Sequence, residues 1–182
     1  MNRVYVLLGT GFEEMEALTP VDLLRRGGIE VRTVGINGKV VYGSHKIGVE
    51  ADILLEEMDL DAMEMMVVPG GLGGVKSIRA SEQAMAAIRY AWEHDRYVAA
   101  ICAGPTVLAD LGITDGKNAT CYPGCEGGMG SAVLEKDKAF VADGKLITGT
   151  SAGCAVKFAL ALVAVMGGFD AAEKVRNQIV IR

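Results

Sequence analysis

YVAAICAGPTVLA, residues 97–109, is the stretch of this sequence that decides the fold. Tyr97–Ala100 is a short apolar run typical of a buried strand. Pro105–Ala109 is typical of a helix with proline in its first turn, where the missing N–H group costs nothing. Between them, Ala100–Gly104 sets a cysteine among small residues, the pattern of a nucleophile elbow. The flanking residues must be small because a larger side chain would collide with so tight a turn.

Cys102, the central residue of this turn, has two interpretations. At a helix N-terminus, the unpaired N–H groups and the helix dipole favour a thiolate, which would make the cysteine reactive. A free cysteine is also commonly a small buried hydrophobic residue. The pentapeptide alone leaves both interpretations open.

Composition limits the class of protein. The chain has 182 residues, about half of them apolar, and a net charge of -5 that is scattered along its length. We expect one domain over residues 1–182. The sequence has neither a basic stripe nor a patch in which aromatic residues are interleaved, which argues against nucleic-acid binding. No signal peptide is evident, and no apolar stretch reaches the roughly 18 residues of a membrane span. We therefore expect a cytoplasmic protein without a membrane anchor.

Cysteine and glycine patterns argue against a metal or a cofactor. Four cysteines in a chain of this length do not resemble a secreted disulfide framework, so we expect reduced thiols. Cys121 and Cys125 have a spacing that could bind zinc, but no second Cys/His pair accompanies them. The glycines of Pro69–Gly74 do not form the GxGxxG dinucleotide fingerprint. We expect no bound cofactor and no metal.

Apolar runs alternate with helical patterns along most of the chain. This alternation predicts a doubly wound α/β fold, with a largely parallel sheet covered on both faces. Asn37-Gly38 and Asp143-Gly144 are hairpin signals. The strands are expected at Arg3–Leu8, Ile29–Ile36, Val40–Tyr42, Met65–Val68, Tyr97–Ala100, Ala119–Tyr122, Phe140–Val141 and Lys145–Thr148. The helices are expected at about Glu13–Arg26, Val75–Glu93 (with Ser81 capping a second segment), from the elbow to Leu111, Gly153–Met166 and Ala171–Asn177.

This fold class places its site at the carboxyl ends of the strands. Four predicted strand ends carry unusual residues, and we expect them to converge: Gly9–Glu16, Pro69–Gly74, Cys102 and Cys121–Pro123.

The first helix begins among three acidic residues, Glu13, Glu14 and Glu16. Acidic residues in a first turn ordinarily compensate the helix dipole. Alternatively, one carboxyl turns back toward Cys102, where desolvation would raise its pKa and let it relay protons. Gly70 and Gly71 offer N–H groups for an oxyanion hole, or form only a tight turn.

Neither histidine has a position in the sequence that suggests a role in a catalytic triad. His94 lies at a predicted helix end, where a cation is ordinary, and His45 lies in a glycine-rich turn. A Cys-His-Asp triad therefore has little support from the sequence.

The cysteine elbow, the early glutamates and the Gly70-Gly71 turn occur in the same order as in the ThiJ/PfpI superfamily. The chain resembles this superfamily and, within it, the Parkinsonism-associated deglycase branch. The matching stretches are Gly11–Glu16, Pro20–Asp22 with Arg25–Ile29, Val67–Gly71 and Ala99–Pro105, with weaker similarity over essentially the whole chain. The resemblance implies a flavodoxin-like (class I glutamine amidotransferase-like) α/β/α sandwich that forms a homodimer. It also implies that Cys102 is the reactive cysteine and Glu16 its carboxyl partner. The N–H groups around Gly71 and of Ala103 would stabilise an oxyanion or an oxidised sulfur.

Two departures from the family pattern limit the mechanism. Many relatives carry a histidine where this chain has Tyr122, and their Arg-Gly-Pro segment is replaced by Thr150–Gly153. Glu16 or water must then carry protons, while Tyr122 would orient a substrate. Cys121 is expected beside the pocket, as a resolving thiol.

The resemblance implies an enzyme of the deglycase or glutathione-independent glyoxalase type. Its substrate would be a small carbonyl compound, such as methylglyoxal, or a glycated amine or thiol. Cys102 would form a hemithioacetal and Glu16 would relay protons. The alternatives are an oxidative-stress sensor or redox chaperone that acts through Cys102 oxidation, and an intracellular peptidase.

Overall fold

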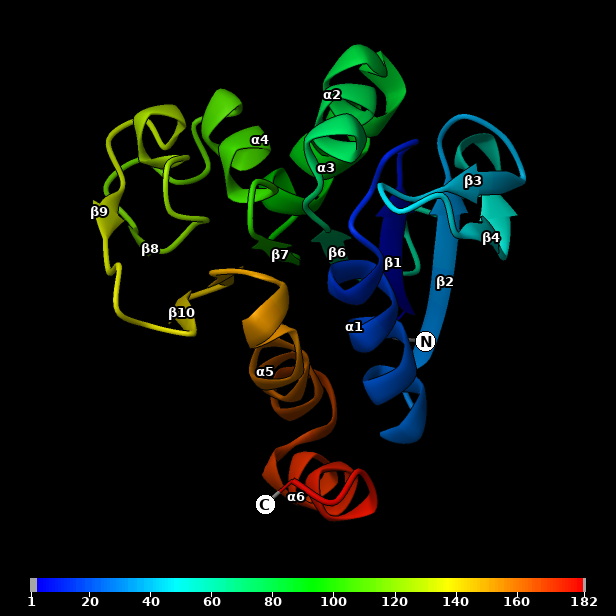
Figure 1. Cartoon of the computed structure of the whole chain (residues 1–182), viewed down its shortest axis with the longest axis vertical. Helices are drawn as coiled ribbons and strands as arrows, with labels where there is room; N and C mark the ends of the chain where they lie inside the picture. Colours follow the sequence, from blue (N-terminus) through cyan, green and yellow to red (C-terminus); the bar gives the residue numbers. More distant parts are fainter. Residues whose placement is uncertain (1–2, 182) are drawn as a thin grey trace.

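The computed structural model describes residues 3–181, and a seven-stranded sheet forms its centre (Figure 1). The strands lie in the order β10-β11-β7-β6-β1-β2-β5, and all neighbouring pairs are parallel except β10 and β11. Their bounds are β1 Arg3–Leu8, β2 Glu30–Gly35, β5 Ile53–Leu54, β6 Met63–Val68, β7 Tyr97–Ile101, β10 Phe140–Asp143 and β11 Leu146–Gly149. The prediction of a mostly parallel α/β sheet is confirmed.

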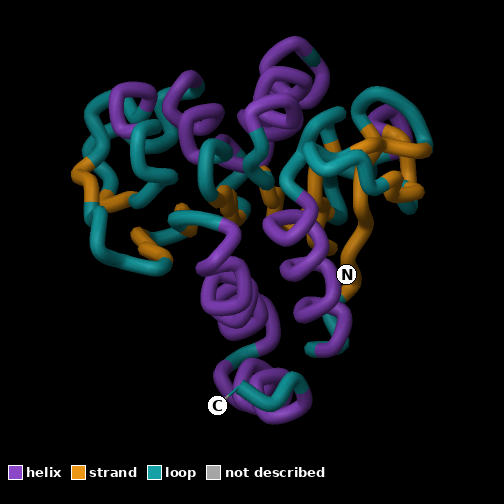
Figure 2. Tube along the Cα trace, viewed as in Figure 1, coloured by secondary structure: helices purple, strands orange, loops and turns teal. Residues whose placement is uncertain are grey.

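Helices cover both faces of this sheet (Figures 1 and 2). One face packs against α1 and α5, with α6 packed on α5, and the other face packs against α2, α3 and α4. The helices span α1 Glu14–Arg26, α2 Leu72–Ala80, α3 Glu82–Glu93, α4 Pro105–Asp110, α5 Ala155–Gly167 and α6 Phe169–Gln178. Short 3₁₀ turns lie at η1 Leu55–Glu57, η2 Glu126–Gly128 and η3 Ala152–Cys154.

The alternation of side chains along β1 shows why two layers form. Val4, Val6 and Leu8 join the core beneath α1 and α5, while Tyr5 and Leu7 join the core beneath α2 and α3. Successive side chains of a strand point to opposite faces, so an apolar run such as this one needs cover on both. The sheet is therefore buried on both sides.

Ser81 divides the predicted helix Val75–Glu93 in two, as its capping role suggested. Its hydroxyl accepts a hydrogen bond from the Ala84 N–H at 3.2 Å, which starts α3. Among the helices of residues 3–181, none has both the length and the apolar character needed to cross a membrane.

Two predictions about strands were wrong, and the first concerns the hairpin expected at Asn37-Gly38. Asn37-Gly38 does not join β2 to β3 in a hairpin, because β1 and β5 already occupy both edges of β2. Instead, β3 (Val40–Tyr42) pairs with β4 (Gly48–Glu50) in a separate two-stranded sheet.

The strand predicted at Ala119–Tyr122 is also shorter than expected. Only β8 (Asn118–Ala119) pairs, in parallel with β9 (Val133–Leu134), outside the central sheet. The following residues leave the strand because the Tyr122 N–H donates to the Cys102 carbonyl at 2.9 Å. Cys121–Pro123 therefore lies in a loop, not at the end of a central strand.

Candidate active site

Cys102 lies immediately after β7, in a backbone conformation that side chains rarely adopt. Its φ angle is 65°, in the left-handed region. Its N–H donates to the Gly149 carbonyl at 2.9 Å, and its carbonyl accepts from Tyr122, so both sides of the residue are held. A Cβ atom at Gly104 would lie only 2.9 Å from the Ile101 carbonyl oxygen, which explains the small residue there. Such a strained turn exposes the nucleophile of an elbow.

Two backbone N–H groups are directed at the sulfur. They belong to Gly71 and Ala103, and both act to lower the pKa of the Cys102 thiol. Gly71 has a φ of 85°, and a Cβ atom there would approach the Glu13 nitrogen and the Phe12 carbonyl carbon at 2.6 and 2.8 Å. The turn after β6 therefore brings this N–H to the thiol only because the residue is glycine. These are the donors that an oxyanion on a Cys102 adduct would need.

Glu16 is the acidic side chain that faces Cys102. It projects from the first turn of α1 and is only 1% exposed. Its Oε2 atom has no hydrogen-bond partner in the described part of the chain. Burial raises the pKa of its carboxyl more than the Cys102 thiol and the N–H groups of Gly70 and Ala152 lower it. Glu16 is therefore a desolvated carboxyl beside a thiol.

Gly70 makes this approach of Glu16 and Cys102 sterically possible. A Cβ atom at Gly70 would collide with Glu16 Oε2 and would lie 2.7 Å from Cys102 Cβ. The Gly70-Gly71 pair thus has two functions: the first residue leaves space, and the second directs an N–H at the sulfur.

Glu16 and Cys102 are coupled in their ionisation, because each acts on the pKa of the other. Burial raises the pKa of Glu16 to about 7. Burial, followed by the negative charge of Glu16, also raises the pKa of the Cys102 thiol above its ordinary value. Burial therefore disfavours a negative charge on either side chain, and the pair can pass one proton between the carboxyl and the thiol. Burial raises the pKa of the Cys102 thiol more than the N–H groups of Gly71 and Ala103 lower it.

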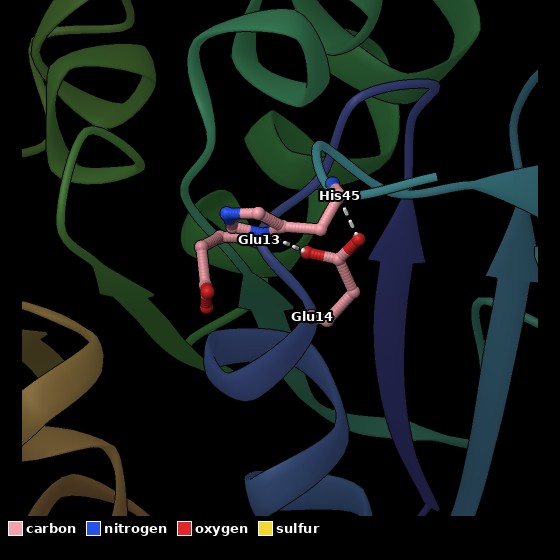
Figure 3. A group of neighbouring side chains, drawn as sticks. All are labelled: Glu13, Glu14 and His45. Carbon is pink, nitrogen blue, oxygen red and sulfur yellow. Dashed lines mark hydrogen bonds and ion pairs between the residues drawn. The ribbon is translucent and has the colours of Figure 1, made fainter. Parts of the chain in front are cut away.

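The three glutamates at the start of α1 have three different partners. Glu13 caps the helix, since its Oε2 accepts from the Glu16 N–H at 2.8 Å. Glu14 is buried and turns away from Cys102 toward the β3–β4 hairpin. It accepts from the His45 N–H at 2.7 Å and from His45 Nδ1 at 2.8 Å (Figure 3). It also accepts from the Ser44 hydroxyl at 3.1 Å. Only Glu16 reaches the thiol.

Glu13, Glu14 and His45 also form the one group of three potential metal ligands found among residues 3–181, with ligand atoms within 4.8 Å of one another (Figure 3). The Glu14 carboxylate is already occupied by the three donors above, and hydrogen bonds from His45 and Ser44 hold its pKa at about 2 despite its burial. The contacts therefore explain this group as the anchor of the hairpin.

A cavity of about 410 Å³ opens above the thiol. Its lining is Glu13, Gly71, Leu72, Cys102, Ala103, Tyr122, Pro123, Gly124 and Cys125. Tyr122 is 47% exposed and forms part of the wall, so its side chain is accessible from the cavity. No histidine belongs to this lining.

The structure places the two neighbouring cysteines differently from the sequence-based expectation. Cys121 is buried against Ala119 and Met129 and does not line the Cys102 cavity. Burial raises its pKa to about 11. Cys125 lines the cavity instead, because the turn from the Tyr122 carbonyl to the Cys125 N–H folds it back.

Sequence reasoning missed Cys125, Leu72 and Ala152. No local motif marks them: Leu72 begins a helix, and Ala152 lies in a 3₁₀ turn that only the packing of α5 brings to Glu16. In Gly70–Gly74, one leucine lies between two pairs of glycines. This pattern was the one feature of the sequence that could have indicated a place for Leu72 beside the site.

A mostly parallel α/β/α sandwich with a cysteine elbow at the carboxyl edge of its sheet, opposed by a buried carboxyl, defines a flavodoxin-like protein with a candidate cysteine site. The chain belongs to the DJ-1/PfpI family, whose model matches residues 2–178. It is 35% identical over 178 residues to protein dj-1beta of Drosophila melanogaster, which covers 97% of this chain and 95% of that relative. The crystal structure of Drosophila melanogaster DJ-1beta superposes with a TM-score of 0.94 at 34% identity, covering 100% of this chain and 98% of the other.

A protein named as a deglycase, from Pyrococcus abyssi, is also similar. It is 31% identical over 147 residues, covering 80% of this chain and 88% of that protein.

Proposed function

We propose that the protein is a cofactor-independent cysteine enzyme acting on 1,2-dicarbonyl compounds or early glycation adducts. The observation that carries this proposal is the Cys102–Glu16 pair, with the N–H groups of Gly71 and Ala103 directed at the sulfur. The similar protein from Pyrococcus abyssi that is named a deglycase supports the same class of chemistry.

In the simplest reaction, methylglyoxal becomes lactate. The Cys102 sulfur attacks the aldehyde carbon, and the thiol proton passes to Glu16 and then to the aldehyde oxygen, which gives a hemithioacetal. The N–H groups of Gly71 and Ala103 stabilise negative charge on that oxygen during attack. Glu16 has a pKa near the working pH, which suits a group that must accept and return protons.

Rearrangement and release complete the cycle. Glu16 removes the proton from the former aldehyde carbon and returns it to the neighbouring carbon, while the hydroxyl proton moves from the former aldehyde oxygen to the ketone oxygen. The product is a thioester of lactate on Cys102. Water then cleaves the C–S bond, which frees lactate and restores the thiol. For a glycated amine, the sulfur displaces the amine from the former aldehyde carbon in the first step, and the amine leaves with the thiol proton. The same rearrangement and hydrolysis then follow.

The test is lactate formation from methylglyoxal, without glutathione and with a chelator present, in wild type and in Cys102→Ala. We expect the variant to lose activity, whereas Cys154→Ser, at a partly exposed free cysteine outside the lining of the cavity, retains it as a matched thiol control. Lactate production that persists in Cys102→Ala would overturn the proposal.

The alternative is a redox sensor in which Cys102 is oxidised to a sulfinate held by the same N–H groups. Oxidation and attack on a carbonyl both require the thiolate, so Glu16 must accept the thiol proton for either role. Mass spectrometry of peroxide-treated protein tests this alternative, and an unmodified Cys102 would count against it. A peptidase would need a base such as histidine, which the lining of the cavity lacks.

We also propose a homodimer. Met15 on α1 is 55% exposed and Val180 is 65% exposed, beside an apolar hollow of about 600 Å³ between α1, α5 and Ile179–Ile181. A second copy would cover these side chains. Sedimentation of wild type and of Met15→Glu measures the mass; a wild-type monomer at micromolar concentration would contradict this assembly.

A further inference from the structure

A second cavity adjoins the Cys102 cavity and has a different chemical character. Its volume is about 480 Å³, within the ~300–1,000 Å³ typical of small-molecule sites. The two cavities share four lining residues: Leu72, Ala103, Gly124 and Cys125. A ligand that reacts at Cys102 can therefore extend past Cys125 into this second space.

Two cations from α2 line the second cavity. Lys76 and Arg79 are separated by three positions, which places them on one side of the helix. Arg79 is fixed by Asp110 at 2.6 Å and by the Thr106 hydroxyl at 2.9 Å. The Thr106 hydroxyl donates in turn to the Ala103 carbonyl at 2.7 Å. The guanidinium is thus held in place next to the elbow.

Lys76 is exposed and forms no ion pair within residues 3–181. The acidic groups nearby are engaged elsewhere. Asp110 pairs with Arg79, while Glu126 pairs with Lys136 at 3.6 Å and accepts from the Gly124 N–H at 2.7 Å. Lys76 and Arg79 contribute two positive charges, and Asp110 offsets one of them. This cavity therefore has one net positive charge.

The charged groups divide the combined site into two ends. Glu13 is the acidic residue in the lining of the Cys102 cavity, and both basic residues lie in the second cavity. An anionic group of a ligand is repelled at the first end and attracted at the second. A single net positive charge suits a monoanion such as a carboxylate.

We propose that the Lys76–Arg79 cavity is a subsite for the carboxylate of substrates whose 1,2-dicarbonyl end reacts at Cys102. This inference rests on the proposed function and specifies its substrate class: short 2-oxoaldehydes that carry a terminal carboxylate. Lys76 is the residue that determines the preference, while Arg79 and Thr106 form the fixed wall behind it.

The first arm of the test compares two five-carbon substrates, 4,5-dioxopentanoate and the neutral 2-oxopentanal. We expect wild type to prefer the anion, and Lys76→Gln to reduce that preference about fivefold through KM, as the loss of one partly solvated charge implies. Lys76→Glu should reduce it further. Lys157→Gln, which changes an exposed lysine on α5, should alter the KM for neither substrate.

The second arm does not depend on turnover. Levulinate and its amide have nearly the same shape but differ in charge, and we measure how each slows labelling of Cys102 by iodoacetamide, by peptide mass. We expect protection by levulinate alone, and its loss in Lys76→Gln. Such protection without turnover of either aldehyde would support the subsite while overturning the proposed function. Equal protection by acid and amide, or an equal preference for the two aldehydes, would overturn the subsite.

Discussion

Glu16 and Cys102 face each other across Gly70, at a position where any added side chain would strike both. A Cβ atom at Gly70 would lie 2.7 Å from Cys102 Cβ and would collide with Glu16 Oε2. Glu16 comes from the first turn of α1 and Cys102 from the turn after β7, so the space left by one glycine brings together residues that are distant in sequence. The chemistry and the stability of the site both depend on this relationship.

Gly70→Ala should therefore lower the activity about 100-fold, because a displacement of about 1 Å at reacting groups costs that much. Its melting temperature should fall as well. The matched control is Gly127→Ala, where an added Cβ meets no heavy atom within 4 Å. Methylglyoxal turnover and thermal unfolding measure the two effects. Similar behaviour of the two alanine variants would show that Gly70 does not set the distance between Glu16 and Cys102.

The rate should depend on pH through Glu16. Its pKa is about 7, and the reaction needs its carboxylate to accept the thiol proton, so kcat/KM should rise as pH increases through 7. Glu16→Gln should lower kcat/KM by roughly 10²–10⁴ and remove this rise. Iodoacetamide labelling of Cys102 across the same pH range separates the ionisation of the thiol from turnover. A variant that keeps the wild-type profile would assign the rise to another group.

Glu16 should also make folding stability depend on pH. Its folded-state pKa of about 7 lies above the ordinary value of 4.5, so the folded protein holds a proton that the unfolded chain releases between these values. Wild type should lose stability as pH rises from 4.5 to 7, by up to about 3 kcal/mol. Glu16→Gln should lack this loss and become the more stable protein at pH 8. Urea unfolding of both proteins at pH 5 and pH 8 tests this prediction. If their free energies of unfolding differed by the same amount at both pH values, Glu16 would not be a desolvated carboxyl.

Glu14 should stabilise the β3–β4 hairpin rather than act in catalysis. Its carboxylate accepts three hydrogen bonds from Ser44 and His45, so Glu14→Gln should cost about 2–4 kcal/mol of stability. The pKa of Glu14, about 2, lies below the ordinary 4.5; the contribution is therefore present above pH 4.5 and is lost as pH falls toward 2. Urea unfolding measures the free energy of unfolding of Glu14→Gln and of the control Glu56→Gln, which changes an exposed glutamate. Equal stability of the two variants would mean that the hairpin does not depend on this carboxylate.

The sequence by itself determined the local features of the site. The small residues around Cys102 and the proline after it suffice to predict a strand, a tight turn and a helix, because these preferences act between neighbours in the chain. The alternation of apolar runs with helical patterns likewise predicted the parallel sheet. Asp143-Gly144 correctly marked the β10–β11 hairpin, where β10 is an edge strand and pairs only with β11.

Only the tertiary structure decided which side chains meet. Glu13, Glu14 and Glu16 are nearly equivalent in sequence, yet one caps a helix, one anchors a hairpin and one reaches the thiol. The pairing of β3 depends on the occupied edges of β2, which no local pattern reveals. The placement of Cys125, rather than Cys121, beside Cys102 depends on one loop turn. Such contacts follow from packing between distant segments, and burial then sets the pKa values that the chemistry uses.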